Sequence, residues 1–259
     1  SAEKWLQTRP EHSIAHCLSR KRPSSAVIAA HPFIPVPRLQ KILVRRDKWH
    51  QQDVMHEQLD GLQLWNGDDE YFMTTGIQEW VQLLLQNHQI GLFAGTDAHG
   101  NFNRFRQIGL PHFSMKENEK QVFGRVHTGL YIDHELSVDR IIKAIQGHHA
   151  FVSSGPFARL DFKTAGKRYR IGDTCSMKSG EIQINCKSSK WFGALKTAVL
   201  IIGDCVMQQE VNCPLELPQA CYSKQVSLDI PDLPEKGYLR LKVETEKESV
   251  AYTNPIYLT

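Results

Sequence analysis

Residues 91–100 read GLFAGTDAHG, and this stretch decides which fold the sequence predicts. The apolar run at its start is typical of a short buried strand, and Asp97 and His99 follow directly. Side chains two residues apart in an extended chain point the same way, so this carboxylate and imidazole can reach one metal ion or a pair. The competing interpretation is a turn that begins at Asp97 with an unrelated histidine nearby. The ligands that neighbouring strands supply decide between the two.

The rest of the first 157 residues alternates apolar runs with amphipathic segments. Apolar residues at helical spacing predict helices over 74–88 and 137–149, the second with Ser137 as N-cap and Gly147 as its C-terminal stop. Short apolar runs predict strands at residues 26–33, 60–67, 90–99, 125–132 and 150–156. This alternation predicts an α/β fold with a parallel sheet or barrel, in which ligands gather at the carboxyl ends of the strands.

Polar side chains end three of these predicted strands. His31 ends the first, Asn66 ends the second within an Asn-Gly pair, and the Asp97–His99 pair ends the third. Imidazole and carboxylate groups suit zinc, iron or manganese, so we expect His31, Asp97 and His99 to be metal ligands. The alternative for His31 is a histidine that is hydrogen-bonded at the rim of the core. Asn66 either orients a ligand or a water, or serves the turn.

His127 begins the fourth predicted strand and is a further candidate. At the rim of a site it would contact a substrate phosphate or act as a general acid, and a purely structural histidine is the alternative. The sequence contains no Gly-x-Ser-x-Gly, no Gly-rich phosphate loop and no His-Glu-x-x-His. We therefore assign the catalytic roles to His127 and Asn66, beside the metal ligands.

The pattern changes after Pro156. Short strand-like runs follow at regular spacing, separated by turns such as Ser179-Gly180 and Gly203-Asp204, and helix-period patterns are absent. This is typical of a small antiparallel sandwich of the immunoglobulin-like kind. We therefore expect residues 1–157 to form a β/α domain and residues 158–259 to form a β-sandwich domain.

Composition excludes some classes of function. The chain has 259 residues and a formal net charge of +3, which is too weak to indicate a nucleic-acid partner. No apolar run approaches the ~20 residues that a membrane helix needs, and residues 1–20 contain no apolar signal-peptide core. The compartment stays undetermined. The six cysteines include no Cys-x-x-Cys pair, so a structural zinc site is not expected, while reduced thiols and disulfides both stay open.

The quoted motifs resemble one family. The runs AVIAAHPF, DGLQLWNG, GLFAGTDAH and RIIKAIQGHHAFVSSGPFARLDF, in this order, are similar to the PHP (polymerase and histidinol phosphatase) superfamily of metal-dependent hydrolases, CehA-type branch. The closing AYTNPIYLT resembles the usual end of that branch. The resemblance implies a distorted β/α barrel with a two- or three-metal centre at the strand carboxyl ends. His31 matches its His-Pro ligand, and Asp97 and His99 match its last pair of ligands.

One departure from the family pattern is large. The family begins with a His-x-His motif on its first strand, and this chain contains no such motif. The resemblance therefore covers the C-terminal half of the barrel, without most of the metal ligands. Three explanations stay open: a fragment of a longer protein, a missing half supplied by another chain, and a degenerate member that serves binding. Each leaves sheet edges to cover, so we expect a homodimer or an N-terminal segment over the open barrel.

The resemblance implies a metal-dependent hydrolase that cleaves a small phosphoester, or another ester, with a metal-activated water. Zinc, manganese or iron ions would be the cofactors, and this chain would carry only part of their site. The rival hypothesis is a non-catalytic binding or assembly module, made of a degenerate barrel remnant and the sandwich. Sequence alone leaves open whether this chain is itself an enzyme.

Overall fold

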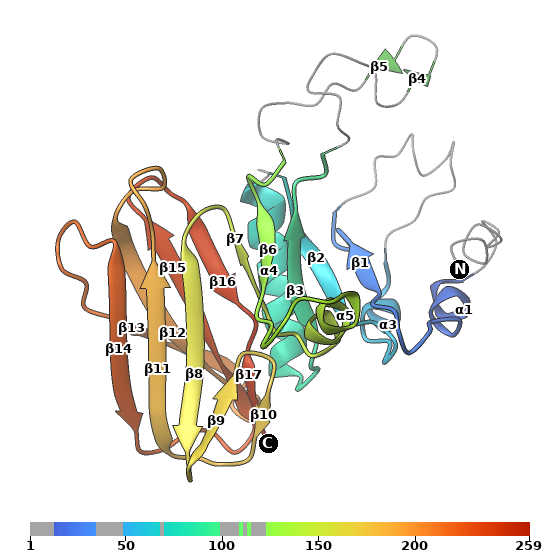
Figure 1. The fold of residues 1–259 in the computed structure, drawn as a ribbon. Helices are drawn as coiled ribbons and strands as arrows, with labels where there is room; N and C mark the ends of the chain where they lie inside the picture. Colours follow the sequence, from blue (N-terminus) through green and yellow to red (C-terminus); the bar gives the residue numbers. More distant parts are fainter. Residues whose placement is uncertain (1–12, 35–48, 68–69, 99–108, 111–112, 115–122) are drawn as a thin grey trace.

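The computed structural model of the protein describes residues 13–34, 49–67, 70–98, 109–110, 113–114 and 123–259 (Figure 1). These residues are mostly β, with 41% in strands and 15% in helices. The helices are α1 (Ile14–Leu18), α3 (Gln51–Val54), α4 (Glu70–Leu85) and α5 (Val138–Gln146). None of the helices in this part of the chain is both long and apolar enough to cross a membrane.

A small parallel sheet carries the predicted metal ligands. Its strands lie in the order β1 (Ile28–Ala30), β2 (Gly61–Asn66) and β3 (Gly91–Gly95). Helix α4 connects β2 to β3, and its Trp80 is fully buried, with the indole N–H donating to the carbonyl of Ile90 at 2.9 Å. These strands confirm the first three predicted strand positions. Helix α5 confirms the second predicted helix and its N-cap, because the Ser137 hydroxyl accepts from the backbone N–H of Arg140.

A larger sheet of eight strands forms the middle of the molecule. Its order is β10-β17-β15-β16-β7-β6, and β12 pairs with both β15 and β13. Every pairing in it is antiparallel except β10 with β17. Its strands are β6 (His127–Leu130), β7 (Ala150–Ser153), β10 (Thr174–Cys175), β12 (Leu195–Asp204), β13 (Gln209–Pro214), β15 (Gly237–Thr245), β16 (Val250–Thr253) and β17 (Ile256–Leu258).

A four-stranded antiparallel sheet covers one face of the larger sheet. Its order is β14-β11-β8-β9, and the bounds are β8 (Phe157–Thr164), β9 (Lys167–Arg170), β11 (Gly180–Lys187) and β14 (Ser223–Ile230). A separate short pair consists of β4 (Gly109–Leu110) and β5 (Phe113–Ser114). In Figure 1 the long strands of the two packed sheets make up the left half of the molecule, and the parallel sheet lies to their right.

Side chains that alternate between the two faces of the larger sheet contribute to two separate hydrophobic cores. On one face, Leu239 and Leu241 pack against Phe162 and other apolar residues of the four-stranded sheet. On the other face, Tyr238 packs into a second core with Trp80 and the leucines of the parallel sheet. Because successive side chains of a strand point to opposite faces, one strand can serve both cores. The eight-stranded sheet is therefore covered on both sides.

Side chains rather than a backbone ladder attach the parallel sheet to the larger sheet. The buried amide of Asn254 pairs with the backbone of Leu92, accepting from its N–H at 2.6 Å and donating to its carbonyl at 3.1 Å. The hydroxyl of Thr128 does the same for Ala94, accepting from the N–H and donating to the carbonyl, both at 2.9 Å. These contacts satisfy polar groups along β3 that have no strand partner on that side.

The predicted α/β barrel is wrong. The described residues form no closed barrel, and they are β-rich rather than α/β. The reason lies after β3, where the fourth and fifth predicted strands become β6 and β7. They pair antiparallel with each other, His127 opposite Ser153, instead of adding parallel strands to β3. Strand β7 then pairs with β16, so strands on both sides of the predicted boundary at residue 158 share one sheet. The boundary itself stays a prediction.

The six cysteines are free thiols in the structure. Cys175 and Cys186 are buried, with 1% and 0% of their surface exposed. Burial raises the pKa of the Cys186 thiol to about 12, since a thiolate would lose its hydration there. Cys186 therefore packs as a small apolar group between the two sheets.

Candidate functional site

The structure brings the predicted residues to one edge of the parallel sheet. His31 follows β1 directly, Asn66 is the last residue of β2, and Asp97 lies two residues after β3. Because the three strands run parallel, their carboxyl ends meet at the same edge. Strand β2 lies between β1 and β3, and Asp97 lies further along the strand direction than His31. The fifth predicted residue, His99, lies outside the described residues.

His31 occupies a tight turn at the end of β1. Its N–H donates to the carbonyl of Gln63 at 2.9 Å, which continues the strand pairing by one residue, and its own carbonyl accepts from Ile34 at 3.3 Å. Its φ is +35°, in the left-handed region that non-glycine residues rarely adopt. Its Nδ1 is buried and has no hydrogen-bond partner among the described residues.

A buried ring nitrogen without a partner needs an explanation, because desolvating a polar atom costs about 1–3 kcal/mol when nothing replaces its water. Native proteins leave few such atoms, and those that persist often belong to binding or catalytic sites. Nδ1 of a neutral imidazole is a metal-binding atom. The unpartnered Nδ1 is compatible with the metal-ligand role that the sequence predicts for His31.

Asp97 shares the backbone feature of His31. Its φ is +53°, again in the left-handed region, and its side chain is exposed while the preceding Thr96 is buried. Sparsely populated backbone conformations of this kind cost of order 1–3 kcal/mol and concentrate at functional sites. The two described metal-ligand candidates thus both lie at strand ends with unusual backbone.

Asn66 lies at the end of β2, and its amide is held by a neighbour on the same strand. Its Oδ1 accepts from Nε2 of Gln63 at 3.1 Å, which fixes the orientation of the amide. Gly67 follows with a φ of +69° and donates its N–H to the carbonyl of Gly95 at 2.8 Å. A Cβ at Gly95 would lie 3.2 Å from the Gln63 amide, so a glycine leaves room for that side chain. Both interpretations of Asn66, the turn and the oriented amide, are compatible with this geometry.

His127 begins β6, next to the end of β3. Its Nδ1 lies 3.2 Å from the carbonyl of Gly124, and the neighbouring Thr128 bonds Ala94 of β3. The ring is half-buried. If Nδ1 carries the proton and donates to Gly124, Nε2 is the acceptor that a proton-transfer role requires. His127 therefore lies at the rim of the same sheet edge.

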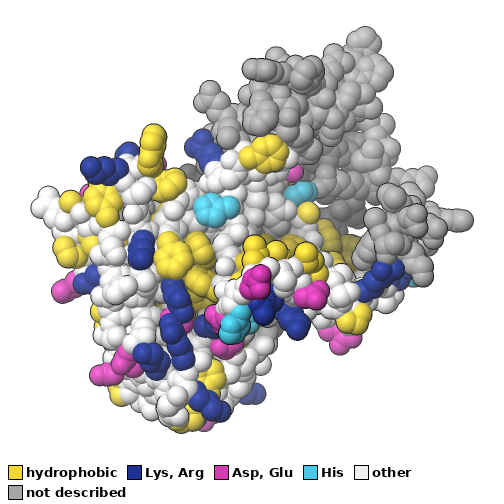
Figure 2. Space-filling model, viewed as in Figure 1, with side chains coloured by type: hydrophobic (Ala, Val, Ile, Leu, Met, Phe, Trp, Pro, Cys, Tyr) yellow, Lys and Arg dark blue, Asp and Glu magenta, His cyan; other side chains and the backbone are white. Residues whose placement is uncertain are grey.

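A hollow that sequence reasoning missed opens on the face of the parallel sheet away from α4. Its volume is about 320 Å³, and it is lined by Ile28, Gln63, Phe93, Thr128, Leu130 and Ile145, among others. The ring of Phe93 lies across Gly61, where an added Cβ would come within 2.2 Å of it. Figure 2 shows hydrophobic side chains gathered above α5 in this part of the visible face. Glycines that begin β2 and β3 are the signal that could have indicated this packing.

The opposite end of the parallel sheet, where β2 and β3 begin, has a structural role. There Nδ1 of His148 lies 3.0 Å from the hydroxyl of Tyr257, the last aromatic residue of β17. Burial lowers the pKa of His148 to about 4, although the nearby charge of Asp60 acts in the other direction. Asp60 itself bonds Lys21 at 2.5 Å and the N–H of Val27 at 2.6 Å. These residues join segments that are distant in sequence, and the neutral imidazole is part of that packing.

The donor set at the predicted edge fits a metal ion in part. His31 offers an unpartnered nitrogen and Asp97 an exposed carboxylate. Within the described part of the chain no three His, Cys, Asp or Glu side chains come close enough together to hold an ion. Catalytic zinc sites use three protein ligands and an open position. The described residues therefore supply two candidate ligands.

Comparison with protein-family models, curated proteins and solved structures finds no match to this chain. The resemblance to PHP hydrolases therefore rests on the sequence motifs alone, and it stays a prediction.

Proposed function

We propose that the carboxyl edge of the β1–β2–β3 sheet is part of the metal site of a hydrolase with the chemistry that the PHP resemblance implies. Its substrate would be a phosphoester or another small ester. His31 and Asp97 are the metal ligands within the described residues, and His99 is the ligand expected from the sequence. This chain would carry only part of the site.

The observation that carries the proposal is the buried, unpartnered Nδ1 of His31 at the end of a parallel strand. Two further features support it. Asp97 follows β3 at the same end of the sheet, and both residues have left-handed backbone, with φ of +35° and +53°. A core histidine usually finds a carbonyl or hydroxyl partner for its ring, although Nε2 of His88 also has none among the described residues.

Each residue has a separate role. A divalent ion at this edge would supply a water of lowered pKa and polarise the scissile ester. His31 would offer a ring nitrogen and Asp97 a carboxylate oxygen to such an ion. Asn66, whose amide is oriented by Gln63, positions a polar group of the substrate. His127 transfers a proton to the leaving oxygen through Nε2.

Metal content and hydrolysis measured on the same protein test this proposal. The purified chain is loaded with Zn²⁺, Mn²⁺ or Fe²⁺, desalted and analysed for bound metal, and hydrolysis of bis(p-nitrophenyl) phosphate is followed. His31→Asn and Asp97→Asn are the informative variants, because asparagine tolerates left-handed backbone and so preserves the turns. His134→Asn is the matched control, since His134 is exposed and has a φ of +70°.

Because the described residues supply two candidate ligands, we expect weak binding: wild type and the His134→Asn variant should bind more metal than the His31→Asn and Asp97→Asn variants, and hydrolysis should follow the metal content. Equal metal retention in all four proteins would show that this edge is no metal site. A wild-type protein that retains none of the three metals and cleaves no ester would favour the binding-module hypothesis instead.

A further inference from the structure

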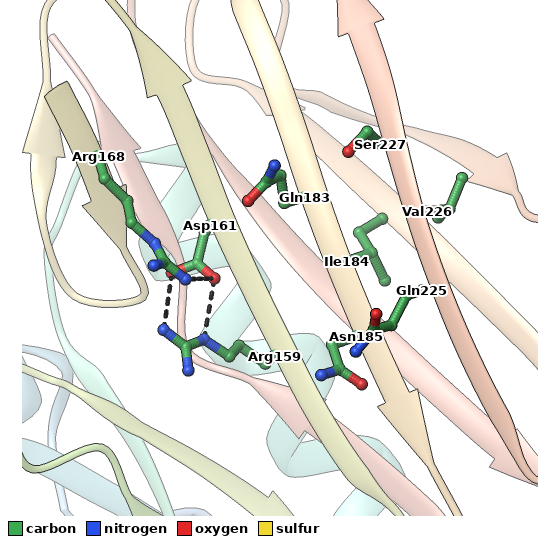
Figure 3. Close-up of a pocket in the computed structure, with 9 residues that line it drawn as sticks. All are labelled: Arg159, Asp161, Arg168, Gln183, Ile184, Asn185, Gln225, Val226 and Ser227. Atoms are coloured by element: carbon green, nitrogen blue, oxygen red, sulfur yellow. Dashed lines mark hydrogen bonds and ion pairs between the residues drawn. The ribbon is translucent and has the colours of Figure 1, made fainter. Parts of the chain in front are cut away.

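A polar hollow lies on the outer face of the four-stranded sheet, far from the edge discussed above. It spans β8, β9, β11 and β14 and has a volume of about 350 Å³. Figure 3 shows the charged groups on one side, over β8 and β9, and the amides and the serine on the other. The lining residues are Arg159, Asp161, Arg168, Gln183, Asn185 and Gln225, together with Ile184, Val226 and Ser227. Ligand sites in proteins begin at about this size, roughly 300 Å³.

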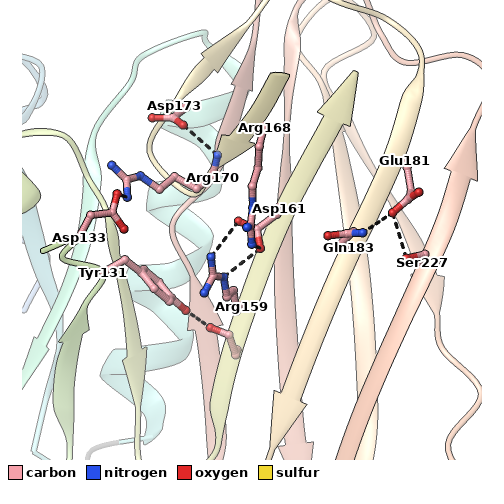
Figure 4. Close-up of polar contacts among 11 residues, drawn as sticks. Tyr131, Asp133, Arg159, Asp161, Arg168, Arg170, Asp173, Glu181, Gln183 and Ser227 are labelled. Carbon is pink, nitrogen blue, oxygen red and sulfur yellow. Dashed lines mark hydrogen bonds and ion pairs between the residues drawn. The ribbon is translucent and has the colours of Figure 1, made fainter. Parts of the chain in front are cut away.

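A buried carboxylate organises the charged side of this hollow. Asp161 is only 3% exposed, and charged residues are almost never buried to that extent without partners. It accepts from Nε of Arg159 at 2.9 Å and from a terminal nitrogen of Arg168 at 2.7 Å. The shared carboxylate raises the pKa of Arg168, which is therefore fully charged. One aspartate thus fixes two guanidinium groups side by side, as Figure 4 shows.

The two guanidinium groups keep donors for a ligand. Each carries five N–H groups, and Asp161 takes two from Arg159 and one from Arg168. Arg159 is further held over the ring of Tyr131, 5.9 Å from its centroid. The side chains of Arg159 and Arg168 are 39% and 51% exposed, so the remaining donors are accessible. Fixing the donors in advance lowers the entropy lost when an anion binds.

The charge of the lining is unbalanced. Two arginines face one aspartate, which leaves one positive charge in the hollow. A further carboxylate, Glu181 on β11, lies beside the hollow. It accepts from the amide of Gln183 and from the hydroxyl of Ser227 at 3.0 Å (Figure 4), and Lys163 lies opposite it on β8. Asp133, on the other side, bonds Arg170. An anionic group of a ligand would complete the balance, and paired N–H donors of arginine match the two oxygens of a carboxylate.

The other side of the hollow presents neutral polar groups in register. Gln183 lies opposite Asp161 on one side and Ser227 on the other, and Asn185 lies opposite Arg159 and Gln225 in the next row. The Oδ1 atom of Asn185 is buried and has no hydrogen-bond partner among the described residues. It is an acceptor that a hydroxyl group can satisfy. The two rows run across β8, β11 and β14, so their donors and acceptors extend over about 10 Å, which is two strand spacings.

We propose that this hollow binds an anionic saccharide, a uronate unit whose carboxylate lies on Arg159 and Arg168. The sugar hydroxyls lie on the amides of Asn185 and Gln225 and on the amide oxygen of Gln183, whose nitrogen donates to Glu181. A sugar fits better than a peptide because the outward-facing side chains of β11 and β14 here are polar, and no apolar side-chain pocket is present among the lining residues. A peptide that added a strand would use a sheet edge rather than this face.

Calorimetric titration of the full chain tests the proposal with three probes. They are a galacturonate trisaccharide, its neutral galactose counterpart, and glutarate, which carries carboxylates without ring hydroxyls. The variants are Arg168→Gln, which removes a guanidinium, and Gln225→Ala, which alters only an exposed amide. Lys163→Gln is the matched control, because Lys163 is an exposed cation on β8 and does not line the hollow. Melting temperatures confirm that each variant is folded.

We expect the galacturonate to bind at least about tenfold more tightly than either other probe, since charge-assisted and hydroxyl contacts combine. Arg168→Gln should weaken binding about tenfold or more, Gln225→Ala by a few-fold, and Lys163→Gln by less than twofold. If glutarate binds as tightly as the galacturonate, the hollow recognises only the anionic group, and the proposal that it binds a saccharide is wrong. No binding of the galacturonate, or equal binding by all variants, would overturn the placement altogether.

Discussion

The parallel sheet and the antiparallel sheets of this protein differ in how their strands are held. Strands β12 and β15 are ten and nine residues long and pair along most of that length. Strand β1 has only three residues, and the outer side of β3 relies on Asn254 and Thr128. The long ladders therefore form the stable body. The parallel sheet is attached to it by a few specific contacts.

Unusual backbone also differs between the two regions. In the antiparallel part, Ala165, Gln208 and Glu248 have positive φ within turns that connect neighbouring strands, where positive φ is ordinary. His31 and Asp97 have positive φ after parallel strands that do not turn back on a neighbour. No hairpin accounts for them. Other positive-φ residues outside hairpins are Asn87, His134, His148 and Ala220, so unusual backbone is not confined to the predicted metal edge. The comparison teaches that the long ladders carry the stability, while the predicted ligands lie on the less tightly paired sheet.

The largest effect should come from the core of the sandwich. Phe162 is fully buried between the two packed sheets, so Phe162→Ala should lower the free energy of unfolding by about 3–5 kcal/mol through lost burial and a cavity. Urea denaturation measures it. Trp191→Ala is the control, since Trp191 is 87% exposed and its removal should change stability by less than about 0.5 kcal/mol. Similar losses in both variants would mean that this core is not packed as described.

The contact between the regions at His148 should make stability depend on pH. Its pKa is lowered from 6.5 to about 4 by burial, so the unfolded chain binds a proton that the folded chain does not. The contribution is complete above pH 6.5 and is lost as the pH falls toward 4, by about 3 kcal/mol in total. Unfolding curves at pH 7 and pH 4.5 measure it. His148→Asn should flatten this dependence, because asparagine does not titrate and tolerates its φ of +56°. An unchanged slope would contradict the assignment.

A smaller effect should come from the side chain that fastens β3. Asn254→Ala leaves the N–H and the carbonyl of Leu92 without their partner in a buried place, which should cost about 2–3 kcal/mol. Asn212→Ala, on the exposed strand β13, is the matched control and should cost less than about 0.5 kcal/mol. Hydrogen exchange should also show faster exchange of β3 amides in the Asn254→Ala variant. Loss spread evenly over all strands would contradict a local role.

Local signals in the sequence predicted much of the secondary structure. Apolar runs located β1 to β3, and the capping serine located the start of α5, since both patterns depend on neighbours in sequence. The pairing of β6 with β7 and β16 was not predictable in this way, because periodicity says nothing about which strand lies next. The β-α alternation then suggested a barrel that the structure does not have. Asn254 illustrates the limit, since its partner Leu92 lies 162 residues away.

The sequence predicted where the candidate site lies, but not the backbone conformation or the hydrogen bonding of its residues. Strand ends indicated His31, Asn66 and Asp97, and the structure places them at one sheet edge. The left-handed backbone of His31 and its unpartnered Nδ1 depend on packing around the turn, which no residue pattern encodes. The hollow on the outer sheet was missed for a related reason. Arg159, Asp161 and Arg168 look like ordinary surface charges until the β8–β9 hairpin brings them together.

The most direct test of the central claim is nitrogen NMR of the histidine rings during titration with Zn²⁺. We predict that Nδ1 of His31 changes its chemical shift as a directly bound ligand at one equivalent, and that this signal is absent in the His31→Asn variant. An Nδ1 resonance of His31 that stays unchanged at saturating Zn²⁺ would contradict the metal site at the end of β1.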